Sequence, residues 1–212
     1  PVPTVIPTGS DPNRFVTDDP SGLPLECGDN QVLVSYVGNT GSVHDGATLG
    51  DALTRALPDL PAVPAIVARR GDRAAELTGP LLEHSNVTVL TSLDEASYRA
   101  TMARTDIALM SLGSGAAVAS VPSKVYAALA AGCAIIAVAP QESDLADLIR
   151  DHGAGVVVRP GDVEGAAAAI RSLATDSTAR SRFAAAARAA AADFTPDALV
   201  DRWAAAMAPL LG

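Results

Sequence analysis

Ser123 and Lys124 combine a helix start with a positive charge, which is the chemistry of an anion site. Pro122 and Ser123 are typical of the first positions of a helix, and residues 124–131 form an alanine-rich segment closed by Gly132. The first turn of a helix presents free N–H groups and the positive end of its dipole. We therefore predict that Ser123 and Lys124 bind an anionic group, with Lys124 as the catalytic cation. The alternative is an ordinary cap followed by a surface lysine.

A glycine-rich turn between a predicted strand and a predicted helix is a second candidate. Glycines allow positive φ angles and a close approach of backbone to a phosphate or sugar, and a histidine nearby is a candidate donor to an oxyanion. The alternatives are a plain turn and a polar surface histidine. The predicted binding residues here are Gly38, Asn39, Thr40, Gly41 and His44.

Two further loops follow predicted strands and offer polar groups. Arg69 and Arg70 stand at a strand end, where guanidinium groups can bind a diphosphate bidentately. Ser114 and Gly115 belong to the small-residue loop 113–120, which could close over a ligand. The alternatives are solvated charges for the arginines and a surface loop without chemistry for the other segment.

Glu142 follows the most apolar predicted strand and could accept hydrogen bonds from ribose or sugar hydroxyls. The alternative is a carboxylate favoured in a first helical turn by the helix dipole. Paired carboxylates at helical spacing, a Ser/His/Asp arrangement and a metal-ligand constellation do not stand out in the sequence. The sequence therefore predicts a binding site without a metal more clearly than a nucleophile.

Alternating strands and helices must position these residues. Apolar runs and helical spacings predict strands at 31–37, 62–68, 86–90, 107–110, 133–140 and 155–158, and helices at 47–57, 72–83, 94–104, 124–131 and 143–151. Three further helices are predicted at 163–174, 178–193 and 196–211. This pattern predicts an α/β fold, a doubly wound, Rossmann-like parallel sheet with extra C-terminal helices, whose ligand lies at the carboxyl ends of the strands. The predicted divisions are a linker at 1–30, a Rossmann-like ligand-binding domain at 31–175 and C-terminal helices at 176–212.

Composition limits the function classes. The 212 residues are 49% hydrophobic and carry a net charge of −9, which argues against nucleic acid or an anionic membrane as the main partner. Cys27 and Cys133 lack metal-like spacing, and we expect a reduced, cytoplasmic protein. The sequence has no apolar run of membrane-spanning length, and it begins at Pro1 without methionine, which suggests a piece of a longer chain.

Several motifs in order resemble the C-terminal, nucleotide-sugar-binding half of a GT-B glycosyltransferase of the group 1, family 4 kind. Residues 5–15 resemble the family's "IPNGVD…F" segment, and residues 36–41 resemble its first glycine turn. Residues 86–90 resemble "NVxFLG", and residues 122–132 resemble "PSKLxEYMAAG". The stretch from 153 to 162 resembles "GAGLVVPPGD".

The resemblance implies a site for a nucleoside diphosphate sugar, UDP-linked in our expectation, with transfer that retains the sugar's configuration and needs no metal or other cofactor. It also implies an N-terminal acceptor-binding domain or subunit as partner, with any membrane association made only through that half. Catalysis would occur between the halves, so we expect this chain to be inactive alone. The implied catalytic term is electrostatic stabilisation of the leaving diphosphate.

The sequence departs from the family in two places. The family's paired glutamates fall at Ala119 and Ala127, and the Arg and Lys usual near the first glycine turn are replaced by residues such as Ser42 and Asp45. Three alternatives therefore stay open: an epimerase or phosphorylase half of the same fold, a non-catalytic module that pairs with a transferase subunit, and a nucleotide-binding regulatory domain.

Overall fold

A single parallel sheet of six strands organises the computed structural model, which describes residues 6–16, 20–60, 63–116 and 121–210. The strand order is β3-β2-β1-β4-β5-β6. The first three strands therefore extend the sheet toward one side of β1, and the last three extend it toward the other side, beginning with β4. This is the order of a doubly wound sheet, and it confirms the predicted fold class. The strands are β1 (Val34–Asn39), β2 (Ala65–Arg70), β3 (Val87–Leu90), β4 (Ile107–Ser111), β5 (Ala134–Val138) and β6 (Gly155–Val158).

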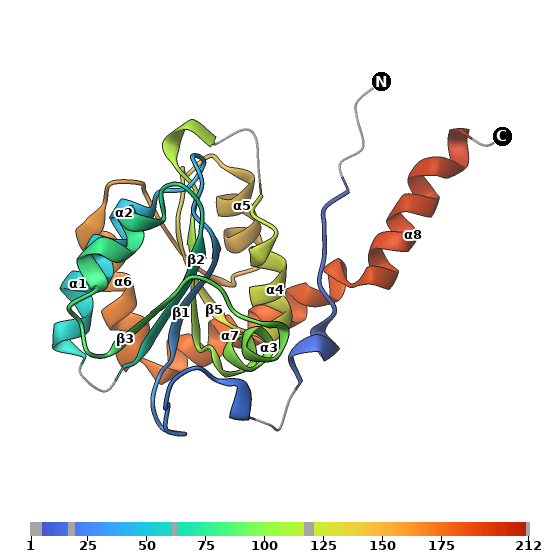
Figure 1. Ribbon diagram of the computed structural model, residues 1–212. Helices are drawn as coiled ribbons and strands as arrows, with labels where there is room; N and C mark the ends of the chain where they lie inside the picture. The colour runs from blue at the N-terminus through green and yellow to red at the C-terminus, as the bar shows by residue number, and fades with distance from the viewer. Residues whose placement is uncertain (1–5, 17–19, 61–62, 117–120, 211–212) are drawn as a thin grey trace.

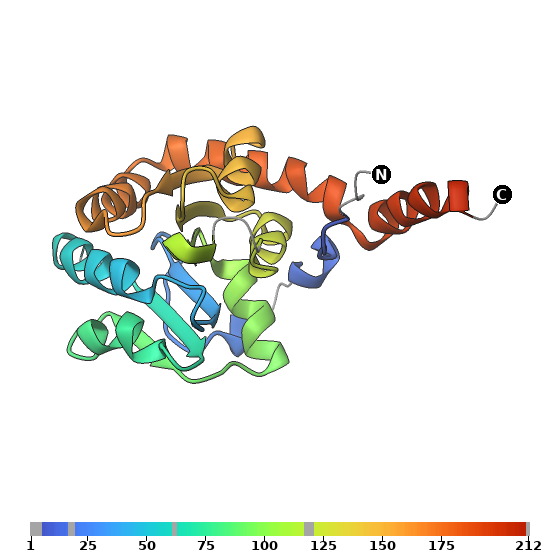
Figure 2. The same ribbon diagram turned by 90° about the horizontal axis from the view of Figure 1, so that it is seen from above.

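Helices cover both faces of the sheet (Figure 1, Figure 2). One face packs against α1 (Gly46–Ala56), α2 (Ala74–Thr78) and α6 (Val163–Thr175). The other packs against α3 (Glu95–Arg104), α4 (Lys124–Ala131), α5 (Asp144–Asp151) and α7 (Ser177–Ala191). Every residue of β4 and β5 is buried, because both strands lie inside the sheet with helices above and below.

Local sequence signals explain most element boundaries. The helix α4 begins and ends where we predicted, and Gly132 ends it in the left-handed conformation at φ 72°. The predicted helix at 72–83 is shorter, since α2 ends at Thr78 and a 3-10 turn follows at Gly79–Leu81. Pro80 lies in that turn and lacks the N–H that would continue an α-helix.

The first strand lies further along the chain than predicted. We predicted residues 31–37, whereas β1 is Val34–Asn39. Gly38 and Asn39 stay in the strand because they pair with Arg69 and Arg70 of β2. Half of the predicted glycine turn is therefore the end of β1, and the chain turns only from Thr40 onward.

The segment that we predicted as a linker packs on the sheet's helices in its described parts. Phe15 closes a 3-10 turn at Pro12–Phe15, is buried, and meets the ring of Tyr98 edge-on with centroids 6.0 Å apart. Arg14 pairs with Glu95 of α3 at 2.8 Å. Residues 1–5, which include Val5 of the resemblance, lie outside the described residues.

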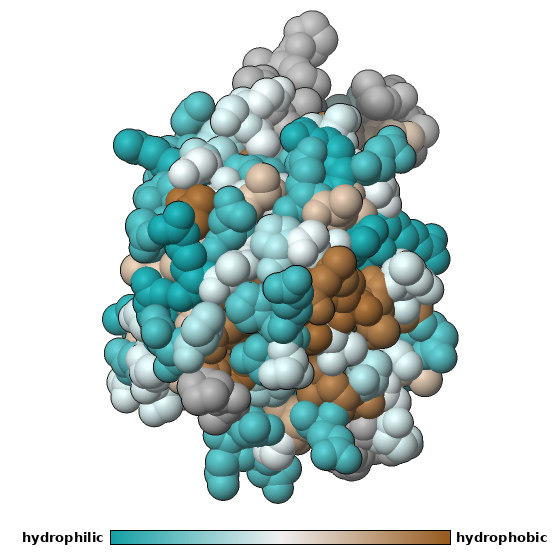
Figure 3. Space-filling model, turned by 60° about the vertical axis from the view of Figure 1, so that its left-hand side comes forward, coloured by the Kyte–Doolittle hydropathy of each residue, from teal (hydrophilic) through white to brown (hydrophobic). Residues whose placement is uncertain are grey.

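The last helix, α8 (Pro196–Met207), projects from the body beside the N-terminal segment (Figure 1, Figure 2). We predicted residues 196–211, but the helix gives way to a 3-10 turn at Ala208–Leu210. None of its residues is buried, and Val200, Trp203 and Met207 are large apolar side chains exposed to solvent. On the face drawn in Figure 3 most of the surface is hydrophilic, with apolar residues gathered near the middle.

None of the helices in the described ranges has the length and apolar character needed to cross a membrane.

Candidate functional site

The switch point of the sheet is open at its carboxyl end. β1 pairs with β2 over six residues, but it pairs with β4 only at Val34 and Ser35, opposite Ile107 and Ala108. Beyond these pairs the two strands separate. Ligands of doubly wound sheets bind at such a point, so this split is the expected place for a ligand site.

Lys124 lies in this split. Its Nζ donates to Tyr36 Oη at 2.7 Å and to the carbonyl of Asn39 at 3.4 Å, and it lies 4.0 Å from the centroid of the Tyr36 ring. A methyl group added at Gly38, whose φ is 146°, would come within 3.1 Å of Lys124 Cδ. Glycine at position 38 is therefore needed both for the backbone angle and for the passage of the lysine side chain.

The Lys124 amine has no carboxylate partner among the described residues, and it is the single lysine of the sequence. Burial lowers its pKa to about 7. Burial also raises the pKa of the Tyr36 hydroxyl to about 12, so this group stays protonated at neutral pH. The site thus holds a desolvated amine without a counter-ion.

Ser123 does not cap α4 as predicted. Its backbone is helical, at φ −56° and ψ −25°, and its side chain makes no capping hydrogen bond, because a capping side chain needs an extended backbone at that position. Ser123 is exposed and lines a cavity of about 220 Å³ with Lys124, Gly38 and His44. Its hydroxyl therefore adds a polar group to the wall of the cavity rather than to the helix.

The turn after β1 is held in place by the turn after β2. The Thr40 N–H and hydroxyl both donate to the carbonyl of Arg70, at 2.7 and 2.9 Å, and the Arg73 N–H donates to the Thr40 carbonyl at 3.2 Å. Thr40 is buried, so its side chain positions the turn. Asn39 is exposed and lines the same cavity as Lys124, while Gly41 accepts a hydrogen bond from the His44 N–H at 3.0 Å.

His44 is half-buried where two cavities meet. Burial first, and then the charge of Lys124, lower its pKa to about 4. The imidazole is therefore neutral at pH 7, where it can donate one hydrogen bond but adds no charge.

Arg69 and Arg70 have different surroundings, although both line a cavity of about 290 Å³ next to the split. Arg69 donates to Thr78 Oγ1 of α2 at 2.9 Å. Arg70 is exposed, and no described residue pairs with its side chain. Of the two predicted arginines, Arg70 is the one whose guanidinium group is available to a ligand.

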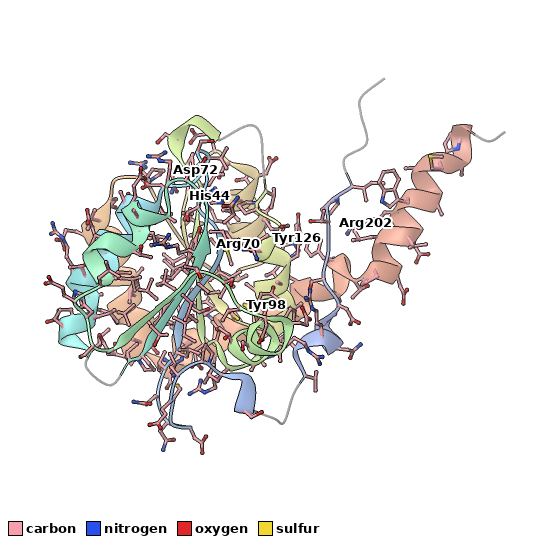
Figure 4. The ribbon with its side chains drawn as sticks, viewed as in Figure 1. His44, Arg70, Asp72, Tyr98, Tyr126 and Arg202 are labelled. Atoms are coloured by element: carbon pink, nitrogen blue, oxygen red, sulfur yellow. The ribbon has the colours of Figure 1, made fainter. Side chains whose placement is uncertain are left out.

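Three cavities join into one furrow along the carboxyl ends of the strands. Gly38 and Asn39 line both the 290 and the 220 Å³ cavities, and His44 lines both the latter and a third of about 230 Å³. Figure 4 labels His44, Arg70 and Tyr98 along this furrow.

The remaining predicted residues divide between the furrow and its surroundings. Ser114 and Gly115 line the third cavity, beside Gly113, whose N–H donates to the Val43 carbonyl at 2.8 Å. Glu142 is exposed after β5 and lines none of the three cavities. The predicted closing loop lies outside the described residues at positions 117–120.

The two alanines that replace the family's glutamates are also separated. Ala127 is buried in the apolar cluster beneath α4, and position 119 lies outside the described residues. In the described ranges no group of three or more His, Cys, Asp or Glu side chains could hold a metal ion.

Sequence reasoning missed two tyrosines of the site. Neither tyrosine was predicted as a site residue, although Tyr36 begins the segment that resembles the family's first glycine turn. Tyr36 contacts Lys124, and Tyr98 lines the 290 Å³ cavity. A tyrosine on a buried strand needs a partner for its hydroxyl, and this was the signal available for Tyr36.

The geometry supports binding and electrostatics. Lys124, Arg70 and the first turn of α4 lie at one edge of the sheet and supply positive charge toward the furrow. Three carboxylates also line it, but each has a partner in the protein: Asp94 caps α3, Asp45 caps α1 and Glu95 pairs with Arg14. Such an arrangement can bind an anion and stabilise charge that develops on it.

Comparison with known proteins gives a family for this chain. The family model for glycosyl transferases group 1 matches residues 32–176. No curated protein sequence matched the chain.

Solved structures of low sequence identity share the fold. The C-terminal domain of a glycosyl transferase group 1 family protein from Francisella tularensis is 16% identical at a TM-score of 0.67, with 87% of this chain and 97% of that domain covered. Sucrose-phosphate synthase from Thermosynechococcus elongatus is 19% identical at a TM-score of 0.70, with 97% of this chain and 52% of that one covered. WaaG, a glycosyltransferase involved in lipopolysaccharide biosynthesis, is 21% identical at a TM-score of 0.66, with 92% and 53% covered. The chain spans about half the length of the latter two.

Proposed function

This chain belongs to the glycosyl transferases of group 1, and we propose that it is the half of such an enzyme that binds a nucleoside diphosphate sugar. The carrying observation is the Lys124 amine, which lies at the switch point of the sheet beside a cavity and has no carboxylate partner in the described residues. A buried amine without a counter-ion favours an anionic ligand, because the ligand supplies the missing charge.

In this proposal the diphosphate binds in the 220 Å³ cavity, next to Lys124, Ser123 and the Gly38–Asn39 strand end. The nucleoside binds in the adjoining 290 Å³ cavity, which Gly38 and Asn39 also line. Arg70 stands at the border of that second cavity and attracts the phosphates. A UDP-linked sugar remains our expected donor.

The proposed reaction is transfer of the sugar to an acceptor with retention and without a metal ion. The protein's part would be to stabilise the negative charge that grows on the leaving diphosphate, through the Lys124 cation, Arg70 and the positive end of the α4 dipole. His44 is neutral at pH 7 and would donate a hydrogen bond to the donor.

The proposed partner is an acceptor-binding half that closes the furrow. Two of the similar structures are about twice as long as this chain, and the projecting helix α8 exposes Val200, Trp203 and Met207. An apolar stripe on an unpartnered helix favours contact with another domain, and we propose that the acceptor-binding half covers it.

A non-catalytic nucleotide-binding module is the second candidate. It is favoured by Ala127, which is buried in the apolar cluster where the family resemblance would place a glutamate. A module of this kind would bind the nucleotide in the same furrow but transfer no sugar in the presence of its partner half.

Calorimetric titration of the chain with UDP, GDP and UDP-N-acetylglucosamine tests the proposal. We expect saturable binding of one or more of these ligands, unchanged after treatment with EDTA. No binding of any of them at millimolar concentration would overturn the proposal, and loss of binding with EDTA would overturn its metal-free form.

A further inference from the structure

Tyr36 and Lys124 form a polar pair inside an otherwise apolar part of the sheet. Tyr36 is fully buried, and its hydroxyl donates to the Asn39 carbonyl at 2.8 Å while it accepts from Lys124 Nζ at 2.7 Å. One hydroxyl group thus fixes the amine relative to the end of β1. Tyr36 has the aromatic ring that a strand prefers, but its position in the network also serves the site.

The groups that face the Lys124 amine carry no negative charge at neutral pH. From β1 and its turn these are Tyr36 and His44, and from α3 the group is Tyr98, which lines a small cavity with the lysine side chain. Burial raises the pKa of Tyr98 and raises that of Tyr36 to about 12, and burial lowers that of His44 to about 4. A protonated Lys124 therefore has no carboxylate at hydrogen-bond distance among the described residues.

We propose that Tyr36 is a positioning residue that holds the Lys124 amine beside the end of β1, and that this amine takes up a proton from solvent when a nucleoside diphosphate binds. This inference rests on the proposed function and adds the linkage between donor binding and protonation. The step forms one N–H bond on the amine and removes one proton from the buffer. The bound diphosphate supplies the anionic partner that the Lys124 amine lacks among the described residues, so the protonated form becomes the favoured one.

The lowered pKa of Lys124, about 7, agrees with this inference. At pH 7 an amine with that pKa is about half protonated, so the Lys124 amine would take up roughly half a proton on average for each ligand that binds. The uptake would approach one proton as the pH rises above 8, until the amine of the complex begins to titrate.

The single lysine makes the test direct. Protein labelled only with ¹³C-lysine gives one side-chain signal, whose pH titration reports the protonation of Lys124 without ambiguity. We expect a midpoint near pH 7 for the free protein and a midpoint higher by about one pH unit or more with saturating UDP. UDP binding, followed by calorimetry, should weaken as the pH rises through that window.

Tyr36→Phe separates positioning from folding. The variant keeps the ring but loses the oxygen that accepts from the amine, so the midpoint of the Lys124 signal should fall below that of the wild type, and UDP affinity should fall about tenfold. Tyr126→Phe is the matched control, because Tyr126 is also a buried tyrosine, on α4 itself, and packs on Phe194 at 5.0 Å between ring centroids. It should change neither quantity.

The outcomes are separable. UDP binding with no shift of the lysine midpoint would overturn the inference and leave the proposed function standing, whereas no UDP binding would overturn both. If Tyr36→Phe leaves the free-protein midpoint and the UDP affinity at the wild-type values, Tyr36 has no positioning role. Because the wild-type titration needs no variant, the proton uptake stays testable even if Tyr36→Phe does not fold.

Discussion

The two ends of the sheet carry cavities of similar size but use their cations differently. At the amino end a cavity of about 310 Å³ is lined by Arg104, Arg180 and Arg188. Arg104 pairs with Asp106 at 2.7 Å, and Arg180 donates to the Leu173 carbonyl at 2.7 Å. At the carboxyl end Lys124 contacts only neutral oxygens.

Two of the three arginines at the amino end are thus held by oxygens of the protein, whereas the Lys124 amine at the carboxyl end has no carboxylate partner among the described residues. Arg104 also donates to the carbonyls of Gly28 and Gln31, at 2.9 and 2.6 Å, so its guanidinium group fastens a loop to the sheet. A cation that already has a carboxylate or carbonyl partner must lose that contact to bind a ligand, whereas Lys124 gains a counter-ion when a ligand binds.

Gly38→Ala should break the carboxyl end most severely. The alanine would have to adopt a φ of 146°, and its methyl group would lie 3.1 Å from Lys124 Cδ. We expect these two effects to lower the free energy of unfolding by about 2 kcal/mol. Thermal unfolding measures this. Gly28→Ala is the matched control, because the nearest atom to the added methyl group, Gln31 Oε1, lies at an ordinary contact distance of 3.6 Å and Gly28 is not among the glycines with positive φ, so it should be close to neutral. Equal effects of the two substitutions would contradict the packing of Lys124 over Gly38.

Lys124→Met should stabilise the fold by about 1 kcal/mol near pH 6, since a buried amine is replaced by an apolar side chain of similar length. The pKa of Lys124 is about 7 when folded and near 10.5 when exposed. The unfolded wild type therefore holds more protons between these values, and wild-type stability rises with pH across this window.

Thermal unfolding midpoints of the wild type and Lys124→Met, measured between pH 6 and 10, would report the difference in stability between the two proteins. The advantage of the Met variant should be largest below pH 7 and should shrink as the pH rises. If Lys124→Met were less stable than the wild type at pH 6, the Lys124 amine would stabilise the folded protein, which contradicts this prediction.

Arg70→Ala and Arg69→Ala sharpen the comparison within the carboxyl end. Loss of the exposed Arg70 guanidinium group should weaken UDP binding about fivefold, an effect of about 1 kcal/mol, with little change in stability. Arg69→Ala should lower stability instead, because Arg69 donates to Thr78. Calorimetric titration of both variants with UDP, together with thermal unfolding, distinguishes a ligand-binding arginine from a stabilising one. Weaker UDP binding by Arg69→Ala and lower stability of Arg70→Ala would contradict the assignment.

Arg188→Ala should give the smallest effect. Arg188 lies at the amino end, on the opposite edge of the sheet from the furrow, so UDP affinity should stay within about twofold of the wild type. A loss of tenfold or more in the same titration would move the anion site to the amino end of the sheet.

The sequence predicted the elements that carry strong local signals. The bounds of α4 and β6 were correct, since Pro and Ser precede the helix, Gly132 ends it, and a short apolar run forms the strand. The alternation of strands and helices predicted a doubly wound parallel sheet, and the sheet has that form.

The internal arrangement of the site could not be predicted in this way. The separation of β1 from β4 depends on the register of strands about seventy residues apart, and the contact of Tyr36 with Lys124 depends on that separation. The same limit applies to Arg69 and Arg70. The two residues are adjacent in the sequence, which does not reveal that Arg69 is the one that donates a hydrogen bond to Thr78.

The most direct test of the central claim is a titration of wild type and Lys124→Met with UDP at pH 7, after thermal unfolding has shown that both proteins are folded. A charge-assisted hydrogen bond contributes about 1.5–3 kcal/mol, so the account predicts that Lys124→Met loses about ten- to a hundredfold in affinity while Arg188→Ala does not. Equal UDP affinity of wild type and Lys124→Met would contradict the claim that Lys124 anchors the diphosphate.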